Sequence, residues 1–93
     1  MPTATEARIA ALLQEAERAH GVYERDALGS VYDEDWPAWY AAWLLESGLG
    51  DLLPGAFDAE AIAARLRQLD ADFRREEPAE PWPVFYAARL TAE

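Results

Sequence analysis

Any chemistry in this 93-residue sequence would centre on its single histidine, His20. Glu24 follows it four positions later and Glu17 precedes it by three, so a helix would place the three side chains on one face. This spacing can present two metal ligands together, or a histidine and a carboxylate that exchange a proton with a substrate. The acidic residues 33–35 could fold back onto the same face, and such a set would suit a divalent cation.

A structural role for His20 is the competing interpretation, in which its ring closes the apolar face of a helix and bonds to Glu24, to Glu17 or to a backbone group. The sequence favours this role because it has no second histidine, no cysteine and no Asp-x-Asp-x-Asp-Gly loop. It also lacks a Gly-x-Ser-x-Gly turn and a phosphate-binding glycine loop, which favours a protein that is not an enzyme. The alternative hypothesis is a protein that binds a small molecule or a divalent metal through His20 and Glu24, near Tyr23 and Tyr32, with catalysis as an extension of that role.

A long first helix, over about 4–28, is expected to carry His20. Thr3 and Glu6 form a capping box at its start, and apolar residues then recur at helical spacing up to His20. Gly21 lowers the stability of a helix by about 1 kcal/mol relative to alanine, and a kink in this helix would fall there.

Three further helices are predicted, and two of them begin with a repeated motif. The motif reads Trp36-Pro37-Ala38-Trp39-Tyr40-Ala41-Ala42-Trp43-Leu44 and recurs as Trp82-Pro83-Val84-Phe85-Tyr86-Ala87-Ala88-Arg89-Leu90. Proline suits the first turn of a helix, and the aromatic residues fall on one broad stripe. We expect helices at about 36–47, with Asp35 as N-cap, and at about 82–92. Between them, Asp58 is expected to cap a helix at about 59–76.

The repeat extends to the helices that precede each motif, because aligning Ile9 with Ile62 also aligns the alanines and leucines that follow. Two explanations stay open: a duplicated helical hairpin, or chance recurrence in an alanine-rich composition. Both predict the same fold class, a single all-α domain over residues 1–93 in the form of a small antiparallel four-helix bundle.

Composition limits the partners that this chain can have. With 18 acidic and eight basic residues the formal net charge is −10, which disfavours direct binding to nucleic acid or to an anionic membrane. The absence of cysteine, of a signal peptide and of a membrane-spanning apolar run leads us to expect a cytoplasmic protein. All the basic residues are arginine and alanine is abundant, which suggests a GC-rich bacterial genome.

The acidic residues are concentrated around the first aromatic motif. No basic residue lies between Arg25 and Arg65, whereas that interval holds eight acidic residues and three tryptophans. Such a surface would suit a basic or apolar protein partner, or a second copy of the chain, because carboxylates speed encounter and aromatic side chains supply affinity. The candidate binding residues are Trp36, Trp39, Tyr40, Trp43, Asp33, Glu34 and Asp35. Two competing interpretations are that the aromatics form the core and that the acids only keep the protein soluble.

The run His20-Gly21-Val22-Tyr23-Glu24 and the segment from Tyr32 to Leu44 resemble a pattern in short helical bacterial proteins that have no described activity. The resemblance covers about a quarter of the chain and implies no catalytic residue, cofactor or substrate. From the residues themselves, we expect a small acidic protein–protein interaction module without a cofactor. A weaker alternative is a nucleic-acid mimic that inhibits a DNA-binding protein.

Overall fold

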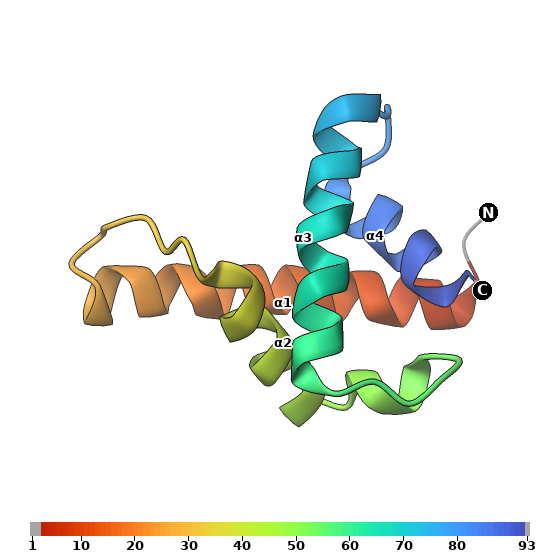
Figure 1. Ribbon diagram of the computed structural model, residues 1–93, viewed down its shortest axis with the longest axis horizontal. Coiled ribbons are helices and arrows are strands. Elements are labelled where there is room, and N and C mark those ends of the chain that lie inside the picture. The colour runs from red at the N-terminus through yellow and green to blue at the C-terminus, as the bar shows by residue number, and fades with distance from the viewer. Residues whose placement is uncertain (1–2, 93) are drawn as a thin grey trace.

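In a computed structural model, which describes residues 3–92, the chain forms four α-helices and one short 3₁₀-helix (Figure 1). The elements are α1 (Ala4–Ala27), α2 (Trp36–Glu46), η1 (Leu49–Leu52), α3 (Ala59–Glu76) and α4 (Trp82–Thr91). No strand occurs within the described residues. The predicted all-α four-helix bundle is therefore confirmed, and no helix among these residues is long and apolar enough to cross a membrane.

Two of the predicted helix starts have the expected caps. The Thr3 hydroxyl accepts a hydrogen bond from the Glu6 backbone N–H at 3.0 Å, and the Glu6 carboxylate accepts one from the Thr3 N–H at 3.1 Å. At α3 the Asp58 carboxylate accepts a hydrogen bond from the Ala61 N–H at 2.8 Å. Both caps satisfy backbone donors that a helix start leaves without an intrahelical partner.

The start of α2 is held differently from the prediction. Asp35 occupies the N-cap position, but its side chain accepts no capping hydrogen bond. Instead, Asp33 accepts two backbone hydrogen bonds: its carboxylate binds the Asp35 N–H at 3.0 Å and its carbonyl binds the Trp36 N–H at 3.2 Å. Pro37 in the first turn has no N–H to satisfy. The N–H groups of Ala38 and Trp39 donate to the Asp35 carbonyl at 3.0 and 3.3 Å, so Asp35 is the N-cap residue but the predicted side-chain cap is not formed.

The first helix passes through Gly21 as one continuous α-helix, and its end is set by two residues in left-handed conformations, Gly29 and Ser30.

We predict that Gly21→Ala raises the free energy of unfolding by about 0.5–1 kcal/mol, because alanine loses less backbone entropy in a helix interior. A Cβ atom built on Gly21 meets no other atom within 4 Å, so no clash opposes this gain. Urea denaturation of the two proteins measures the difference, and a less stable variant would contradict the prediction.

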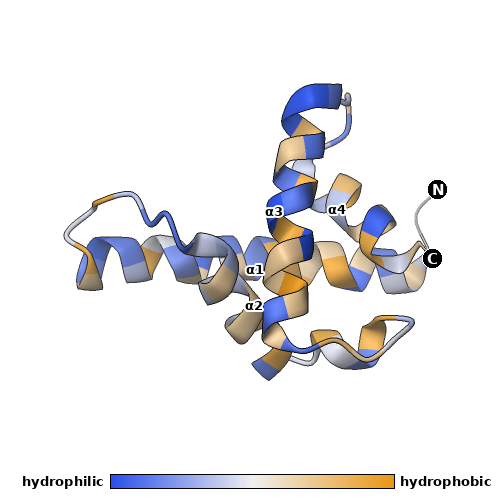
Figure 2. Ribbon diagram, viewed as in Figure 1, coloured by the Kyte–Doolittle hydropathy of each residue, from blue (hydrophilic) through white to orange (hydrophobic). Residues whose placement is uncertain are grey.

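The two short helices lie between the two long ones. Helices α2 and α4 each pack against both α1 and α3, whereas the backbones of α1 and α3 do not approach one another directly within residues 3–92. Figure 1 shows α3 crossing α1, with α2 and α4 on either side of the crossing. In Figure 2 apolar residues gather where the helices meet, and the C-terminal end of α3 is hydrophilic.

The halves α1–α2 and α3–α4 have equivalent packing. Most of the buried core consists of pairs that the sequence alignment matches, namely Ile9 and Ile62, Leu13 and Leu66, Tyr40 and Tyr86, Ala41 and Ala87, and Leu44 and Leu90. The helix contacts correspond in the same way, since α1 packs on α4 as α3 packs on α2. The repeat in the sequence is therefore also a repeat in three dimensions.

Candidate ligand-binding groove

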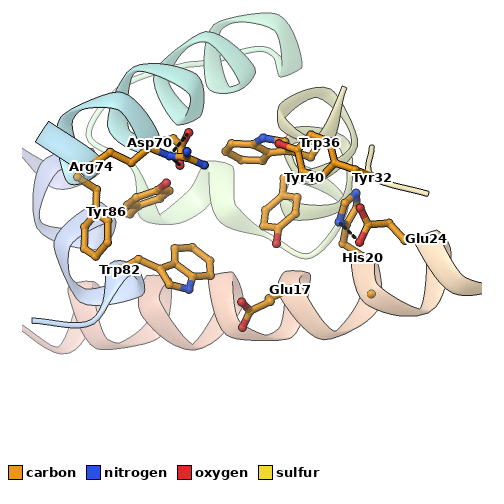
Figure 3. A pocket seen from close by; sticks show the side chains of 12 residues that line it. Glu17, His20, Glu24, Tyr32, Trp36, Tyr40, Asp70, Arg74, Trp82 and Tyr86 are labelled. Carbon is orange, nitrogen blue, oxygen red and sulfur yellow. Dashed lines mark hydrogen bonds and ion pairs between the residues drawn. The ribbon is translucent and has the colours of Figure 1, made fainter. Parts of the chain in front are cut away.

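A groove of about 570 Å³ runs between α1 and α3, and α2 and α4 contribute its aromatic walls (Figure 3). This volume lies within the range of natural ligand sites. The residues that line it are Glu17, His20, Gly21, Glu24, Tyr32, Trp36, Tyr40, Asp70, Phe73, Arg74, Trp82 and Tyr86. Nearly all of them fall into matched pairs from the two halves of the chain, so the groove lies where the halves meet.

The aromatic walls consist of two equivalent pairs. The rings of Trp36 and Tyr40 pack edge to face at 5.3 Å, and those of Trp82 and Tyr86 do so at 5.0 Å. Both tyrosines belong to the buried core, and both tryptophans are half-buried against it. The groove therefore offers rigid aromatic surface, which in binding sites supplies much of the contact energy at low entropic cost.

Both tyrosine hydroxyls remain protonated at neutral pH. Burial, followed by the negative charges of Glu17 and Glu24, raises the pKa of Tyr40 to about 12. Burial and the charge of Asp70 raise the pKa of Tyr86 even further. Tyr40 is only 8% exposed, and its hydroxyl takes part in no hydrogen bond within residues 3–92. Since no side-chain oxygen or nitrogen of these residues is both buried and unpaired, this hydroxyl must reach the surface of the groove.

The groove has a negative charge. Three carboxylates line it, those of Glu17, Glu24 and Asp70, against one guanidinium, that of Arg74. The Arg74 Nε atom lies 3.2 Å from the Asp70 carboxylate. Glu17 forms no ion pair within residues 3–92. The free negative charge therefore lies on the α1 side of the groove.

At the end of the groove, His20 is held between two carboxylates. Its Nε2 atom lies 2.9 Å from the Asp33 carboxylate, and its Nδ1 atom lies 3.8 Å from that of Glu24. The ring is 6% exposed and packs against Trp39 at 5.0 Å and Tyr40 at 5.1 Å. The ring is thus packed and hydrogen-bonded, as the competing interpretation has it, but the partner in the hydrogen bond is Asp33 and not Glu17, Glu24 or the backbone.

Metal binding by His20 and Glu24 stays a prediction. Within the described part of the chain, no group of three or more His, Cys, Asp or Glu side chains is arranged to hold a metal ion. A metal at His20 Nε2 would have to replace the hydrogen bond to Asp33.

Asp33 fastens the loop between α1 and α2, because its N–H also donates to the Glu24 carboxylate at 3.1 Å. We predict that Asp33→Ala lowers the free energy of unfolding by about 1–3 kcal/mol, since it leaves a buried imidazole without its partner. Amide hydrogen exchange in residues 28–35 should also speed up. Glu34→Ala is the matched control, because Glu34 is exposed and should change stability by less than about 0.5 kcal/mol. Equal effects of the two variants would contradict the fastening role.

The structure divides the predicted binding residues among different places. Trp36 and Tyr40 line the groove. Trp39 packs on His20 and on Tyr23, whose ring lies 5.5 Å away, and Trp43 packs half-buried against the core. The Asp33 carboxylate is hydrogen-bonded to His20. Glu34 and Asp35 are exposed and do not line the groove.

Sequence reasoning missed the second half of the groove, which comprises Asp70, Phe73, Arg74, Trp82 and Tyr86. The signal that could have found it was the repeat, because Trp82 and Tyr86 are the counterparts of Trp36 and Tyr40.

Comparisons of the chain with protein-family models, with curated proteins and with solved structures gave no match.

Proposed function

We propose that this protein is a small cytoplasmic binding module whose groove between α1 and α3 receives a basic, partly apolar segment of a protein partner. The observation that carries the proposal is the lining of the groove, in which two Trp–Tyr pairs lie beside three carboxylates and a single guanidinium.

The aromatic pairs support a partner with apolar side chains. Tryptophan and tyrosine are enriched among residues that dominate binding energy, because their rings bury large areas. The half-buried indoles of Trp36 and Trp82 are already fixed by their tyrosine neighbours, so a ligand would lose little side-chain entropy in them.

The charges support a basic partner. A chain with a net charge of −10 attracts cations over a distance, and carboxylates within the groove would continue that attraction into the site. The same charge opposes association of two copies of this chain, which favours a different protein as the occupant.

The proposal predicts selective binding of a basic peptide. A short capped peptide of alternating arginine and leucine should change the tryptophan fluorescence and bind more weakly as salt is added, whereas a glutamate–leucine peptide should not bind. Glu17→Gln should weaken binding by about threefold to tenfold, since it removes a groove carboxylate that forms no ion pair within the described residues.

Glu15→Gln is the matched control, because Glu15 lies on the same helix but outside the groove. It should leave the affinity close to that of the unmodified protein. Binding of the acidic peptide, or equal losses in the two variants, would refute the proposed function.

A further inference from the structure

The two sides of the groove share their aromatic walls and one pair of carboxylates, and they differ at two matched positions, His20 against Phe73 and Gly21 against Arg74. In the alignment that matches Ile9 with Ile62, Glu17 of α1 corresponds to Asp70 of α3, and all four residues of the aromatic walls are matched. One turn beyond these carboxylates, however, α3 has Arg74 where α1 has Gly21. The groove is thus nearly symmetric in its anions and asymmetric in its cations.

On the α3 side, the protein itself supplies the cation. Arg74 lies one helical turn after Asp70, and its guanidinium approaches the Asp70 carboxylate to 3.2 Å at the edge of the groove. The pair shows which chemical group fits beside a carboxylate and a Trp–Tyr pair in this fold. Because the Arg74 side chain is largely exposed, the pair contributes little to the stability of the fold. Its geometry nevertheless shows how an arginine can lie beside a groove carboxylate.

On the α1 side, the same place is open. Gly21 has no side chain, and a Cβ atom there would meet nothing within 4 Å. Glu17 forms no ion pair within residues 3–92, and the buried Tyr40 presents its hydroxyl to the groove without a hydrogen-bond partner among those residues. Figure 3 shows the Glu17 carboxylate and the Tyr40 hydroxyl pointing toward the same space, with Trp82 beside it.

We infer that this space, bounded by Glu17, Gly21 and Tyr40, is a seat for the guanidinium group of an arginine from the partner. The inference rests on the proposed function and names the group that the groove recognises. The guanidinium would pair with Glu17 as Arg74 pairs with Asp70, and its remaining N–H groups would donate to the Tyr40 hydroxyl oxygen. Its flat face would lie against the indole of Trp82, a contact that a guanidinium makes better than an ammonium.

The test fills the seat from within the protein. Gly21→Arg places an arginine one turn after Glu17 and so reproduces the arrangement of Asp70 and Arg74. Gly21→Ala is the control, because it changes the same backbone position without adding a cation. The probes are three capped peptides of leucines around one central residue, which is arginine, lysine or citrulline, the uncharged analogue of arginine.

Gly21→Ala measures the effect of a small uncharged side chain at this position, and Gly21→Arg should bind the arginine peptide about tenfold more weakly than Gly21→Ala does. For the unmodified protein, replacing arginine with citrulline should cost about tenfold and replacing it with lysine a smaller factor. If Gly21→Arg binds as Gly21→Ala does, or if citrulline or lysine binds as tightly as arginine, the seat is not a guanidinium site.

These outcomes are separate from the failure of the proposed function. If no basic peptide binds the unmodified protein, the binding module and its seat are both refuted. If basic peptides bind but neither Gly21→Arg nor citrulline changes the affinity, the module stands and the seat alone is refuted. Should Gly21→Arg fail to fold, the citrulline and lysine peptides still decide the question on the unmodified protein.

Discussion

Truncation of Leu44 to alanine is expected to lower the free energy of unfolding by about 2–5 kcal/mol. Leu44 has no exposed surface and lies in the core on α2, which packs against both α1 and α3. The variant loses the hydrophobic transfer energy of its missing carbons and leaves a cavity that the helices can close only in part. Because domains of this size are stable by about 5–15 kcal/mol, the loss should be visible in a urea denaturation curve.

The repeat supplies a second measurement of the same kind. Leu90 is the counterpart of Leu44 on α4 and is 4% exposed, so Leu90→Ala should cost a similar amount. Leu45→Ala is the control, since Leu45 is the next residue on α2 but is only half-buried, and it should cost clearly less. If Leu44→Ala and Leu45→Ala were equally stable, the described packing of α2 would be wrong.

Alkaline pH is expected to destabilise the fold through Tyr40 and Tyr86. Well below pH 10.0, the ordinary tyrosine pKa, both residues are protonated in the folded and unfolded chains, and full stability is present. Above it, the unfolded chain releases its protons first, because burial raises the pKa of Tyr40 to about 12 in the folded protein. Stability should therefore fall as the pH rises, by about 2–3 kcal/mol from Tyr40 alone by pH 12, and further from Tyr86.

The composition limits the side chains that can cause a change of stability at alkaline pH. The sequence has no cysteine and no lysine, so tyrosine is the only kind of side chain in it whose ordinary pKa lies between about 9 and 12. Urea denaturation across that range should show the decline in the unmodified protein. It should be largely absent in a variant with Tyr40→Phe and Tyr86→Phe, and unchanged in Tyr32→Phe, because Tyr32 is 66% exposed. An equal decline in the double variant would locate the alkaline sensitivity elsewhere.

The helices could be predicted from the sequence because they depend on local signals. Helical periodicity placed Ile9, Leu13 and His20 on one buried face, and the caps at Thr3 and Asp58 depend on contacts within a few residues. The capping role of Asp35 failed for an equally local reason, because Pro37 has no N–H to donate and the Ala38 N–H donates to the Asp35 carbonyl and not to its carboxylate. Sequence spacing does not decide whether the carbonyl or the carboxylate of a residue at the N-cap accepts a donor.

The site could be predicted only in part, because a groove needs two elements that are distant in the sequence. Trp36, Trp39 and Trp43 share one helical stripe, but the stripe is wide enough to face three neighbours. In the fold Trp36 faces the groove, Trp39 packs on the ring of His20, and Trp43 packs against the core. Periodicity identifies a face of a helix but not its neighbour. The repeat held the missing information, since it marks Trp82 and Tyr86 as counterparts of groove residues.

The packing of the first helix on the last has a consequence for how the chain matures during its synthesis. Helix α1 leaves the ribosome before α2 and α3, yet it packs extensively on α4 (Trp82–Thr91), which leaves after them. Until α4 has emerged, much of the apolar face of α1 has no helix to pack against. The apolar face of α2 has no such partner until α3 has emerged. A chain with such long-range pairings is expected to remain unfolded or loosely collapsed while it grows. We therefore expect this domain to complete its fold only after α4 has left the ribosome, in a single cooperative step.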